Sequence, residues 1–119
     1  MEQIYAANGA KPIGPYTPAI KAGHLVYLSG QTGGIADQDV KLQAEATCKN
    51  VAALLEAAGV GFEDVIKTPC FLADIADFAA FNEVYAKYFI SKPARSCVAV
   101  KDLPGSGNLC EIEVIAYKE

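Results

Sequence analysis

The sequence predicts an α+β fold, a two-layer sandwich in which two helices cover one face of a mixed six-stranded sheet. Two observations lead to this class. Short apolar and β-branched runs bounded by turn residues predict strands near both ends of the chain, and two stretches with helical spacing lie between them. The expected order is β-β-β-α-β-α-β-β. Such a sheet leaves its other face open, so we expect self-association to cover it.

The N-terminal part of the chain is expected to form three strands. Residues 4–6 form a short first strand, and residues 8–15, which are rich in turn-forming residues, form a loop. Residues 19–22 and 25–29 are separated by a Gly-His pair, and this pattern is typical of a β-hairpin.

Apolar residues at spacings of four, three, four and three predict a first helix over residues 42–58. Gly59 follows directly, and glycine is common at the position after a helix end. We therefore expect the helix to stop there and to pack its apolar face on the sheet. That face consists of Ala44, Cys48, Val51, Leu55 and Ala58.

The rest of the chain is expected to hold a strand, a second helix and two further strands. Residues 65–73 form the strand, although Pro69 lacks a backbone N–H, which favours an edge position or a local distortion. The second helix starts near an Asp77 cap. Residues 93–100 and the segment around 111–113 form the last strands. The apolar stripe of the second helix consists of Phe78, Phe81, Tyr85 and Tyr88.

Length and charge limit the function classes. A chain of 119 residues is expected to form a single domain over residues 1–119. The net charge is -4 and the basic residues are scattered, so we expect no nucleic-acid partner, because phosphate binding needs clustered lysine and arginine. No apolar run is long enough to span a bilayer, so no membrane partner is expected either.

The four cysteines predict free thiols rather than a disulfide framework or a zinc site. They form no C-x-x-C pair, no secretory signal precedes them, and His24 is the single histidine. Reduced thiols indicate a reducing compartment, and we expect a cytoplasmic protein. Cys48 and Cys70 fall on apolar positions and are assigned to the core.

A candidate site is expected where a cation and two carboxylates interrupt the last two strands. Arg95 stands at the start of one apolar strand, and Glu111 and Glu113 occupy alternate positions of the other. Charges at such positions are unfavourable unless they meet each other or a ligand. If the two strands pair, Arg95 and Glu111 would lie close together at one end of the sheet. In the alternative interpretation, Arg95 only pairs with Glu111 or Glu113 to set the strand register.

At these residues the chain resembles the RidA (YjgF) family of reactive intermediate deaminases, and the match runs nearly end to end. The segment before Arg95, residues 88–93, is shorter than in other members. The motifs that carry the resemblance are Ile13-Gly14-Pro15-Tyr16, Leu28-Ser29-Gly30-Gln31, Asp64-Val65-Ile66-Lys67-Thr68, Phe81-Asn82-Glu83-Val84-Tyr85, and Pro93-Ala94-Arg95-Ser96 through Glu111-Ile112-Glu113.

The resemblance implies a chorismate-mutase-like fold that assembles as a homotrimer with active sites between subunits. The implied reaction is hydrolysis of 2-imino acids and enamines, such as 2-iminobutanoate and 2-iminopropanoate, to 2-keto acids and ammonia. It implies no metal and no organic cofactor. The implied partners are therefore small 2-imino and 2-keto acids.

The resemblance also implies a role for each site residue. Arg95 would bind the substrate carboxylate, because a planar guanidinium can donate two parallel hydrogen bonds to it. Glu111 would position and activate water together with the main chain around Cys97. A nucleophilic Cys97 is disfavoured because no base is placed near it. The cleft would be lined by Tyr16, Ser29, Gly30 and Asn82.

Plainer roles remain open for the lining residues. Tyr16 could close a loop onto the core, Asn82 could be a surface or capping residue, and Ser29-Gly30 could be a strand end. Other functions also remain open. A trimer could bind a small carboxylate as a sensor without turnover, or hold unfolded chains. A ribonuclease or translation inhibitor is disfavoured by the acidic charge balance.

Overall fold

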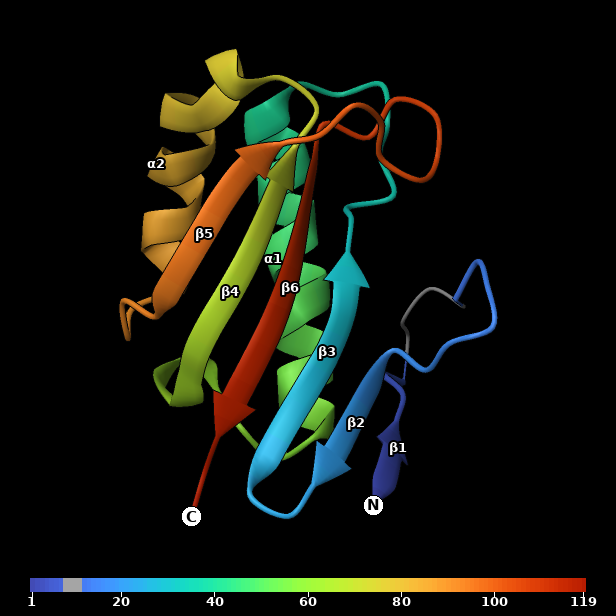
Figure 1. Ribbon diagram of the computed structural model, residues 1–119, viewed down its shortest axis with the longest axis vertical. Helices are drawn as coiled ribbons and strands as arrows, with labels where there is room; N and C mark the ends of the chain where they lie inside the picture. Colours follow the sequence, from blue (N-terminus) through green and yellow to red (C-terminus); the bar gives the residue numbers. More distant parts are fainter. Residues whose placement is uncertain (8–11) are drawn as a thin grey trace.

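In the computed structural model, which describes residues 1–7 and 12–119, six strands form one sheet in the order β1-β2-β3-β6-β4-β5 (Figure 1). The β4–β5 pair is parallel and the other pairs are antiparallel, so the sheet is mixed. The elements are β1 (Glu2–Ile4), β2 (Ala19–Ala22), β3 (Leu25–Gln31), α1 (Val40–Ala57), β4 (Val65–Leu72), α2 (Phe78–Tyr88), β5 (Ala94–Ala99) and β6 (Cys110–Tyr117).

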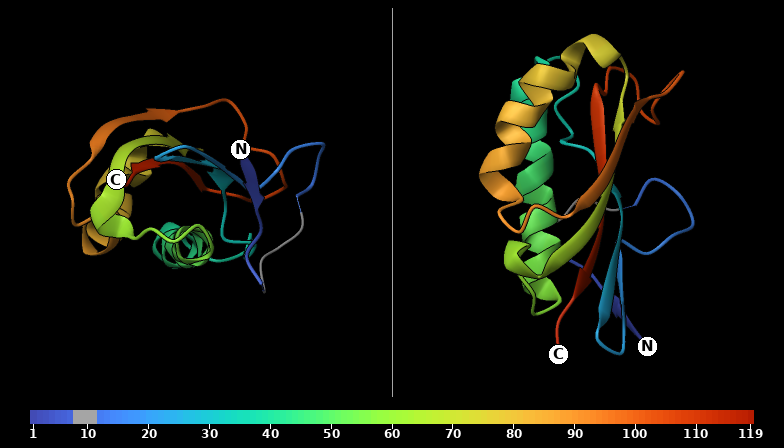
Figure 2. Two further views of the ribbon diagram at one scale, coloured as in Figure 1. Left: turned by 90° about the horizontal axis from the view of Figure 1, so that it is seen from below. Right: turned by 60° about the vertical axis from the view of Figure 1, so that its left-hand side comes forward.

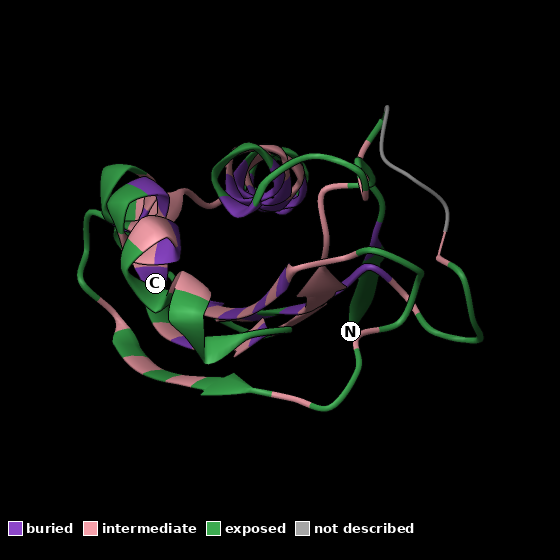
Figure 3. Cartoon of the chain, turned by 90° about the horizontal axis from the view of Figure 1, so that it is seen from above, coloured by how far each residue is buried: buried purple, intermediate pink, exposed green. Residues whose placement is uncertain are grey.

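Helices α1 and α2 cover one face of this sheet, and no helix covers the other face in the part of the chain that the structure describes (Figure 2). Buried residues lie between the two layers (Figure 3). The predicted two-layer α+β class and the order of its elements are therefore confirmed. None of the described helices is long and apolar enough to cross a membrane.

The predicted apolar face of α1 is buried along its whole length, as expected from its spacing. Gly59 follows the helix with φ +78°, a conformation that glycine adopts without strain. The start of α1 was expected at Leu42 but lies at Val40, because the Asp39 carboxylate caps the helix by accepting a hydrogen bond from Leu42 N at 2.9 Å.

Other element boundaries correct the predictions. β1 lies at Glu2–Ile4 rather than at residues 4–6. Helix α2 starts directly after Asp77, as expected, but the Asp77 side chain accepts no hydrogen bond from the helix. Asp74 instead accepts one from Ala76 N, and it starts a short 3₁₀ turn, Ile75–Asp77, that leads into the helix. The expected loop over residues 8–15 includes residues 8–11, which lie outside the described residues.

The position of β4 is the main difference from the sequence-based expectation. Pro69 suggested an edge position or a local distortion, and the edge position is wrong, because β4 lies between β5 and β6. Pro69 pairs with Ser96 of β5, while the pairing with β6 passes from Lys67 directly to Cys70. A residue without an N–H fits at this interruption. The register shift in this strand pair lies earlier, between Val65 and Lys67.

The open face of the sheet carries large apolar side chains. Tyr27, Val98 and Tyr117 are 43%, 48% and 41% exposed, and their register places them on the face away from the helices. Exposed apolar side chains on a sheet face that no described helix covers favour an interface with another chain.

Candidate active site

Arg95 lies on the helix-covered face of the sheet, at its β5 edge. Residues that pair across neighbouring strands share a face, and Arg95 pairs with Thr68 of β4, which is fully buried beneath the helices. The Arg95 side chain accordingly points toward α2. The edge position of β5 leaves the guanidinium partly accessible.

Three side chains of α2 hold the Arg95 guanidinium. Its Nη1 donates a hydrogen bond of 2.8 Å to Asn82 Oδ1. Its Cζ lies 4.6 Å from the centre of the Tyr85 ring and 5.4 Å from that of Phe78, within the range of cation–π attraction. The ion pairs among the described residues are Lys41–Glu83 and Lys87–Glu45, so no carboxylate there neutralises Arg95. A guanidinium has five N–H donors, and most of them remain available to an anion.

A hollow of about 400 Å³ adjoins Arg95. It is bounded by the C-terminal half of α2 and by the short segment that leads into β5. Lys92 in this segment has φ +51°, a left-handed conformation unusual for a residue other than glycine. The residues that line the hollow are Tyr85, Ala86, Phe89, Ile90, Lys92, Pro93 and Arg95.

Cys97 follows Arg95 on the same face of β5, opposite the buried Cys70. Burial raises the pKa of the Cys97 thiol above its usual range, and the nearby Arg95 opposes this effect only in part. The thiol is therefore protonated at neutral pH. This agrees with a packing and main-chain role for Cys97 and disfavours a nucleophilic one.

Glu111 lies on the opposite, open face of the sheet. It pairs with Phe71 of β4, which is three positions beyond Thr68, and an odd number of positions along a strand reverses the face. In the part of the chain that the structure describes, no basic side chain lies within ion-pair distance of Glu111. Partial burial, and to a lesser extent the charge of Glu113, raise the pKa of the Glu111 carboxyl.

Gly30 lies directly against the Glu111 side chain, at an irregularity in β3. Leu28 pairs with Val114 and Gln31 with Ile112, so Ser29 and Gly30 together face one residue of β6 and form a bulge. A Cβ atom at Gly30 would lie 2.8 Å from Cδ of Glu111 and closer still to Oε2. The Glu111 carboxylate therefore occupies space that a side chain at position 30 would fill.

Ser29 connects this bulge to the loop that carries Tyr16. Its Oγ donates a hydrogen bond of 2.7 Å to Thr17 O, and its backbone N donates one of 2.8 Å to Pro18 O. Tyr16 itself is 46% exposed and does not close onto the core. Ser29 is thus more than a strand end, because it fixes the base of the Tyr16 loop.

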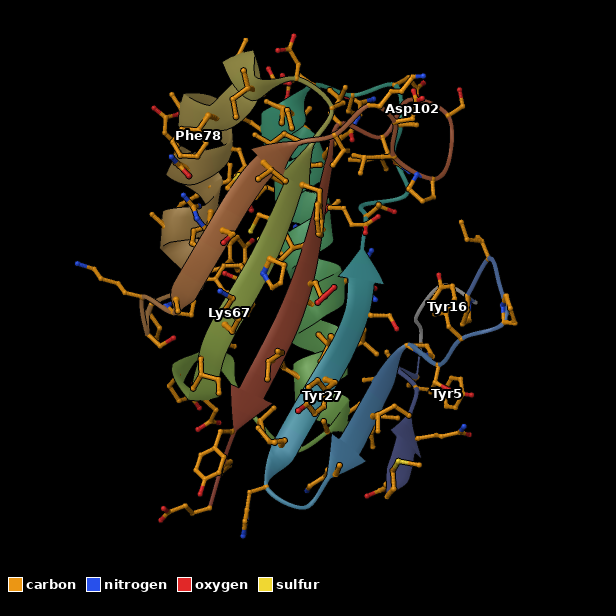
Figure 4. All side chains as sticks on the ribbon, viewed as in Figure 1. Tyr5, Tyr16, Tyr27, Lys67, Phe78 and Asp102 are labelled. Carbon is orange, nitrogen blue, oxygen red and sulfur yellow. The ribbon has the colours of Figure 1, made fainter. Side chains whose placement is uncertain are left out.

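The predicted site residues therefore form two separate groups within one chain. Arg95, Asn82 and Cys97 lie at the β5–α2 side, and Glu111 lies on the open face beside Gly30. Figure 4 shows Phe78 and Tyr16 at opposite sides of the molecule. We refer below to the Arg95 group (Asn82, Arg95, Cys97) and the Glu111 group (Tyr16, Ser29, Gly30, Glu111).

The expectation that Arg95 and Glu111 lie close together is wrong for a single chain. β5 and β6 do not pair, because β4 lies between them. Two strand spacings and three residues along the strand place their Cα atoms about 14 Å apart. The alternative, an ion pair of Arg95 with Glu111 or Glu113 that sets strand register, is also wrong, since both carboxylates lie on the sheet face opposite to Arg95.

The contacts of Phe78 and Tyr85 with Arg95 were not anticipated, because both residues were assigned to an apolar stripe. Phe81 of that stripe is fully buried, whereas Phe78 is 39% exposed. The available signal was the spacing of Phe78, Asn82 and Tyr85, which differ by four and three positions and share a helix face. Among the described residues, no group of three or more His, Cys, Asp or Glu side chains could hold a metal ion.

Replacing Gly30 with alanine is expected to displace the Glu111 carboxylate without unfolding the protein. The new methyl group would overlap the carboxyl group, which is the movable end of a flexible side chain. If Glu111 acts in catalysis, turnover should fall by about 10-fold or more, because small misplacements of catalytic groups are costly. Gly14→Ala is the matched control, since a Cβ there would lie 3.5 Å from the Tyr16 ring, an ordinary contact that requires no displacement of that side chain. Unchanged turnover in Gly30→Ala would contradict the prediction.

Comparison with known proteins identifies the family. The family described as "Endoribonuclease L-PSP" matches residues 7–118. A RutC family protein of Pyrococcus horikoshii is 50% identical over an alignment 125 residues long, gaps included, and the alignment covers 99% of this chain and 98% of the relative. The Reactive Intermediate Deaminase A of Arabidopsis thaliana, a chloroplastic protein, is 45% identical over 122 residues, which cover 97% of this chain and 65% of the relative.

A solved structure agrees with these sequence matches. E. coli TdcF with bound serine superposes with a TM-score of 0.93 at 37% identity, and the match covers 100% of both chains. The sequence matches extend over nearly the whole chain, and the shared fold includes the sheet and helices that carry both groups of site residues. The chain therefore belongs to the RidA (YjgF) family.

Proposed function

We propose that this protein is a reactive intermediate deaminase that hydrolyses small 2-imino acids, such as 2-iminobutanoate and 2-iminopropanoate, to 2-keto acids and ammonia. Membership of the RidA family supports deaminase activity in general. The observation that carries the finer proposal is the Arg95 guanidinium, which α2 holds in place and which no carboxylate neutralises among the described residues. Such a group suits the carboxylate of a small substrate.

The proposed chemistry needs few groups. The imine carbon is electrophilic, above all when the nitrogen is protonated. Glu111 takes a proton from water as the oxygen attacks the carbon of the protonated imine, and it returns this proton to the nitrogen of the resulting carbinolamine. The hydroxyl proton then passes to Glu111 as the C=O bond forms and the C–N bond breaks, so that the nitrogen leaves as ammonia. The raised pKa of Glu111 brings its carboxyl closer to the working pH, which suits a group that both accepts and donates protons. The main chain around Cys97 would help to position the water.

We further propose that each site is shared between two copies of the chain in a homotrimer. Arg95 and Glu111 lie on opposite faces of one sheet, so one substrate cannot contact both within one chain. The open face bears exposed apolar residues as well as Glu111. If the open face of one copy packs beside the β5 edge of the next, the Glu111 group and the Arg95 group meet across the interface.

The shared site predicts complementation between two inactive variants. Arg95→Ala retains Glu111, and Glu111→Gln retains Arg95. After denaturation and refolding as an equal mixture, random trimers should recover about one quarter of native activity, because one interface in four combines the two intact groups. Each variant refolded alone is the control. Sedimentation would confirm the assembly, and a mixture no more active than the separate variants would refute sharing.

A binding protein without turnover is the second candidate. It is favoured by the relative TdcF, whose structure contains serine, a small carboxylate-bearing molecule. Although the family description includes the word endoribonuclease, the net charge of -4 and the scattered basic residues of this chain do not favour an RNA substrate.

Keto-acid release separates these candidates. An amino-acid dehydratase generates 2-iminobutanoate or 2-iminopropanoate in place, and the rate of 2-keto acid formation is compared without protein, with the native chain and with Arg95→Ala. A deaminase accelerates release and Arg95→Ala does not. A protein that binds 2-oxobutanoate but leaves the rate at the uncatalysed value is a sensor, and the deaminase proposal is then wrong.

The pH profile tests the role of Glu111 as a base. A raised pKa means that the carboxyl ionises at higher pH than an ordinary glutamate, so the acidic limb of the kcat profile should lie above pH 4.5. The negative charge of Glu113 contributes to this raise. Glu113→Gln removes that charge and should move the acidic limb to lower pH. An acidic limb that stays in place would argue against Glu111 as the titrating base.

A further inference from the structure

We propose that Tyr85 is a positioning residue for Arg95 and that the buried hydroxyl of Thr68 sets its orientation. This inference rests on the proposed role of Arg95 as the carboxylate-binding group. Tyr85 itself need not contact the substrate, because it acts through the guanidinium that its ring supports.

Tyr85 is held at both ends. Its phenolic oxygen and Thr68 Oγ1 share a hydrogen bond of 2.5 Å, and Thr68 is fully buried on the neighbouring strand β4. Its ring stacks on the buried Phe89 with centroids 4.3 Å apart and an interplanar angle of 18°. A rotation of the Tyr85 side chain would break the stack and leave a buried hydroxyl without its partner, which is unfavourable.

The position of Thr68 connects this support directly to Arg95. Thr68 and Arg95 are paired residues of the parallel strands β4 and β5, so their side chains leave the sheet on the same face. Tyr85 reaches down from α2 to the Thr68 hydroxyl and presents its ring to the guanidinium 4.6 Å away. The Thr68–Arg95 pair thus fixes both the point at which the Arg95 side chain leaves the sheet and the position of the Tyr85 ring that supports its guanidinium.

The phenol is suited to this role because it stays neutral. Burial raises the pKa of Tyr85, and the hydrogen bond with Thr68 lowers it only in part. A neutral aromatic ring attracts a cation through its face without forming an ion pair that would compete with an anionic ligand. Together with the Asn82 hydrogen bond, the ring restricts the rotamers of Arg95 before the ligand arrives, which lowers the entropic cost of binding.

Binding of 2-oxobutanoate, measured by calorimetry, tests the inference independently of turnover. Tyr85→Leu removes the ring and should raise Kd and KM by about 10-fold, within the range expected for a partly desolvated cation–π contact. Tyr85→Phe and Thr68→Val keep the ring but remove the 2.5 Å hydrogen bond, so a smaller rise, about threefold, is expected. Thr68→Ser retains the hydroxyl, so Kd and KM should stay at their native values. In the other three variants kcat should change less than Kd.

Tyr88 provides the matched control on the same helix. Its hydroxyl donates a 2.5 Å hydrogen bond to Glu45 and its ring packs on Phe62, but it is not among the aromatic residues over Arg95. Tyr88→Leu and Tyr88→Phe should therefore loosen α2 without changing Kd. Thermal unfolding and sedimentation of every variant verify that the fold and the assembly are retained. If Tyr85→Leu does not fold, Tyr85→Phe and Thr68→Val still test the inference.

Two patterns would overturn the role of Tyr85 while leaving the proposed function intact. In one, Arg95→Ala abolishes binding while the Tyr85 and Thr68 variants bind 2-oxobutanoate as the native protein does. In the other, the Tyr88 variants raise Kd as much as the Tyr85 variants, which would indicate general loosening of the helix. If Arg95→Ala leaves both binding and keto-acid release unchanged, the proposed function fails, and the role of Tyr85 fails with it.

Discussion

Replacing Arg95 with alanine is expected to abolish measurable 2-oxobutanoate binding and to reduce kcat/KM for 2-iminobutanoate by about 100-fold or more, equivalent to ~2.7 kcal/mol of transition-state stabilisation. The variant removes a cation that three side chains of α2 hold in place. Charge-assisted bidentate hydrogen bonds are among the strongest that a protein makes to a small carboxylate, and no other cation lies among the residues that hold Arg95. Calorimetry and the coupled keto-acid assay measure the two effects.

Two further variants show that this loss is specific to the guanidinium. Arg95→Lys keeps the charge but loses the planar pair of donors, so we expect only partial recovery of binding. Lys92→Gln removes the other cation that lines the same hollow, and it should bind and turn over substrate nearly as the native chain does. If Arg95→Ala and Lys92→Gln weakened binding equally, general electrostatic attraction would explain the data and Arg95 would lose its assigned role.

Replacing Glu111 with glutamine is expected to reduce kcat by about 10² to 10⁴-fold, the usual contribution of a positioned general base. Glutamine keeps the shape of the side chain beside Gly30 but cannot accept a proton at neutral pH. Because Arg95 belongs to a different group of residues, binding of 2-oxobutanoate should remain within about threefold of native. Loss of turnover with binding preserved would therefore separate the chemical step from carboxylate recognition.

Glu113→Gln is the matched control, since Glu113 occupies the same strand face two positions away. It should retain turnover at neutral pH, where Glu111 alone is assigned the proton transfers. Full turnover in Glu111→Gln combined with loss in Glu113→Gln would transfer the role of base to Glu113. Full turnover in both would remove the carboxylates from the mechanism.

The regular elements of the fold could be predicted because their signals are local. The spacing of Ala44, Cys48, Val51 and Leu55 defines one helix face in any context, and all four are buried as predicted. The hairpin of β2 and β3 was predicted from two apolar runs around a Gly-His turn, and it is present. Periodicity and turn chemistry depend only on residues close together in the chain, so the sequence alone is enough to recognise them.

Boundaries and strand neighbours were predicted less well because they depend on competition between distant segments. Asp77 occupies the predicted N-cap position of α2 without a side-chain hydrogen bond, because a 3₁₀ turn that Asp74 caps precedes the helix. Pro69 suggested either an edge strand or a local distortion, and the sequence did not decide between them; β4 is interior and accommodates Pro69 because pairing with β6 is interrupted there. No local pattern reveals which strand will lie on either side of another.

The amino-acid sequence alone determined the class of fold, the family resemblance and the identity of the residues proposed for the site, since motifs and periodicity are properties of the chain. Only the tertiary structure decided how those residues are distributed. Because β4 lies between β5 and β6, Arg95 and Glu111 occupy opposite faces of the sheet, and because α2 packs beside β5, Tyr85 and Asn82 hold the guanidinium. Strand order and helix packing result from the burial of the whole core, which no single motif encodes.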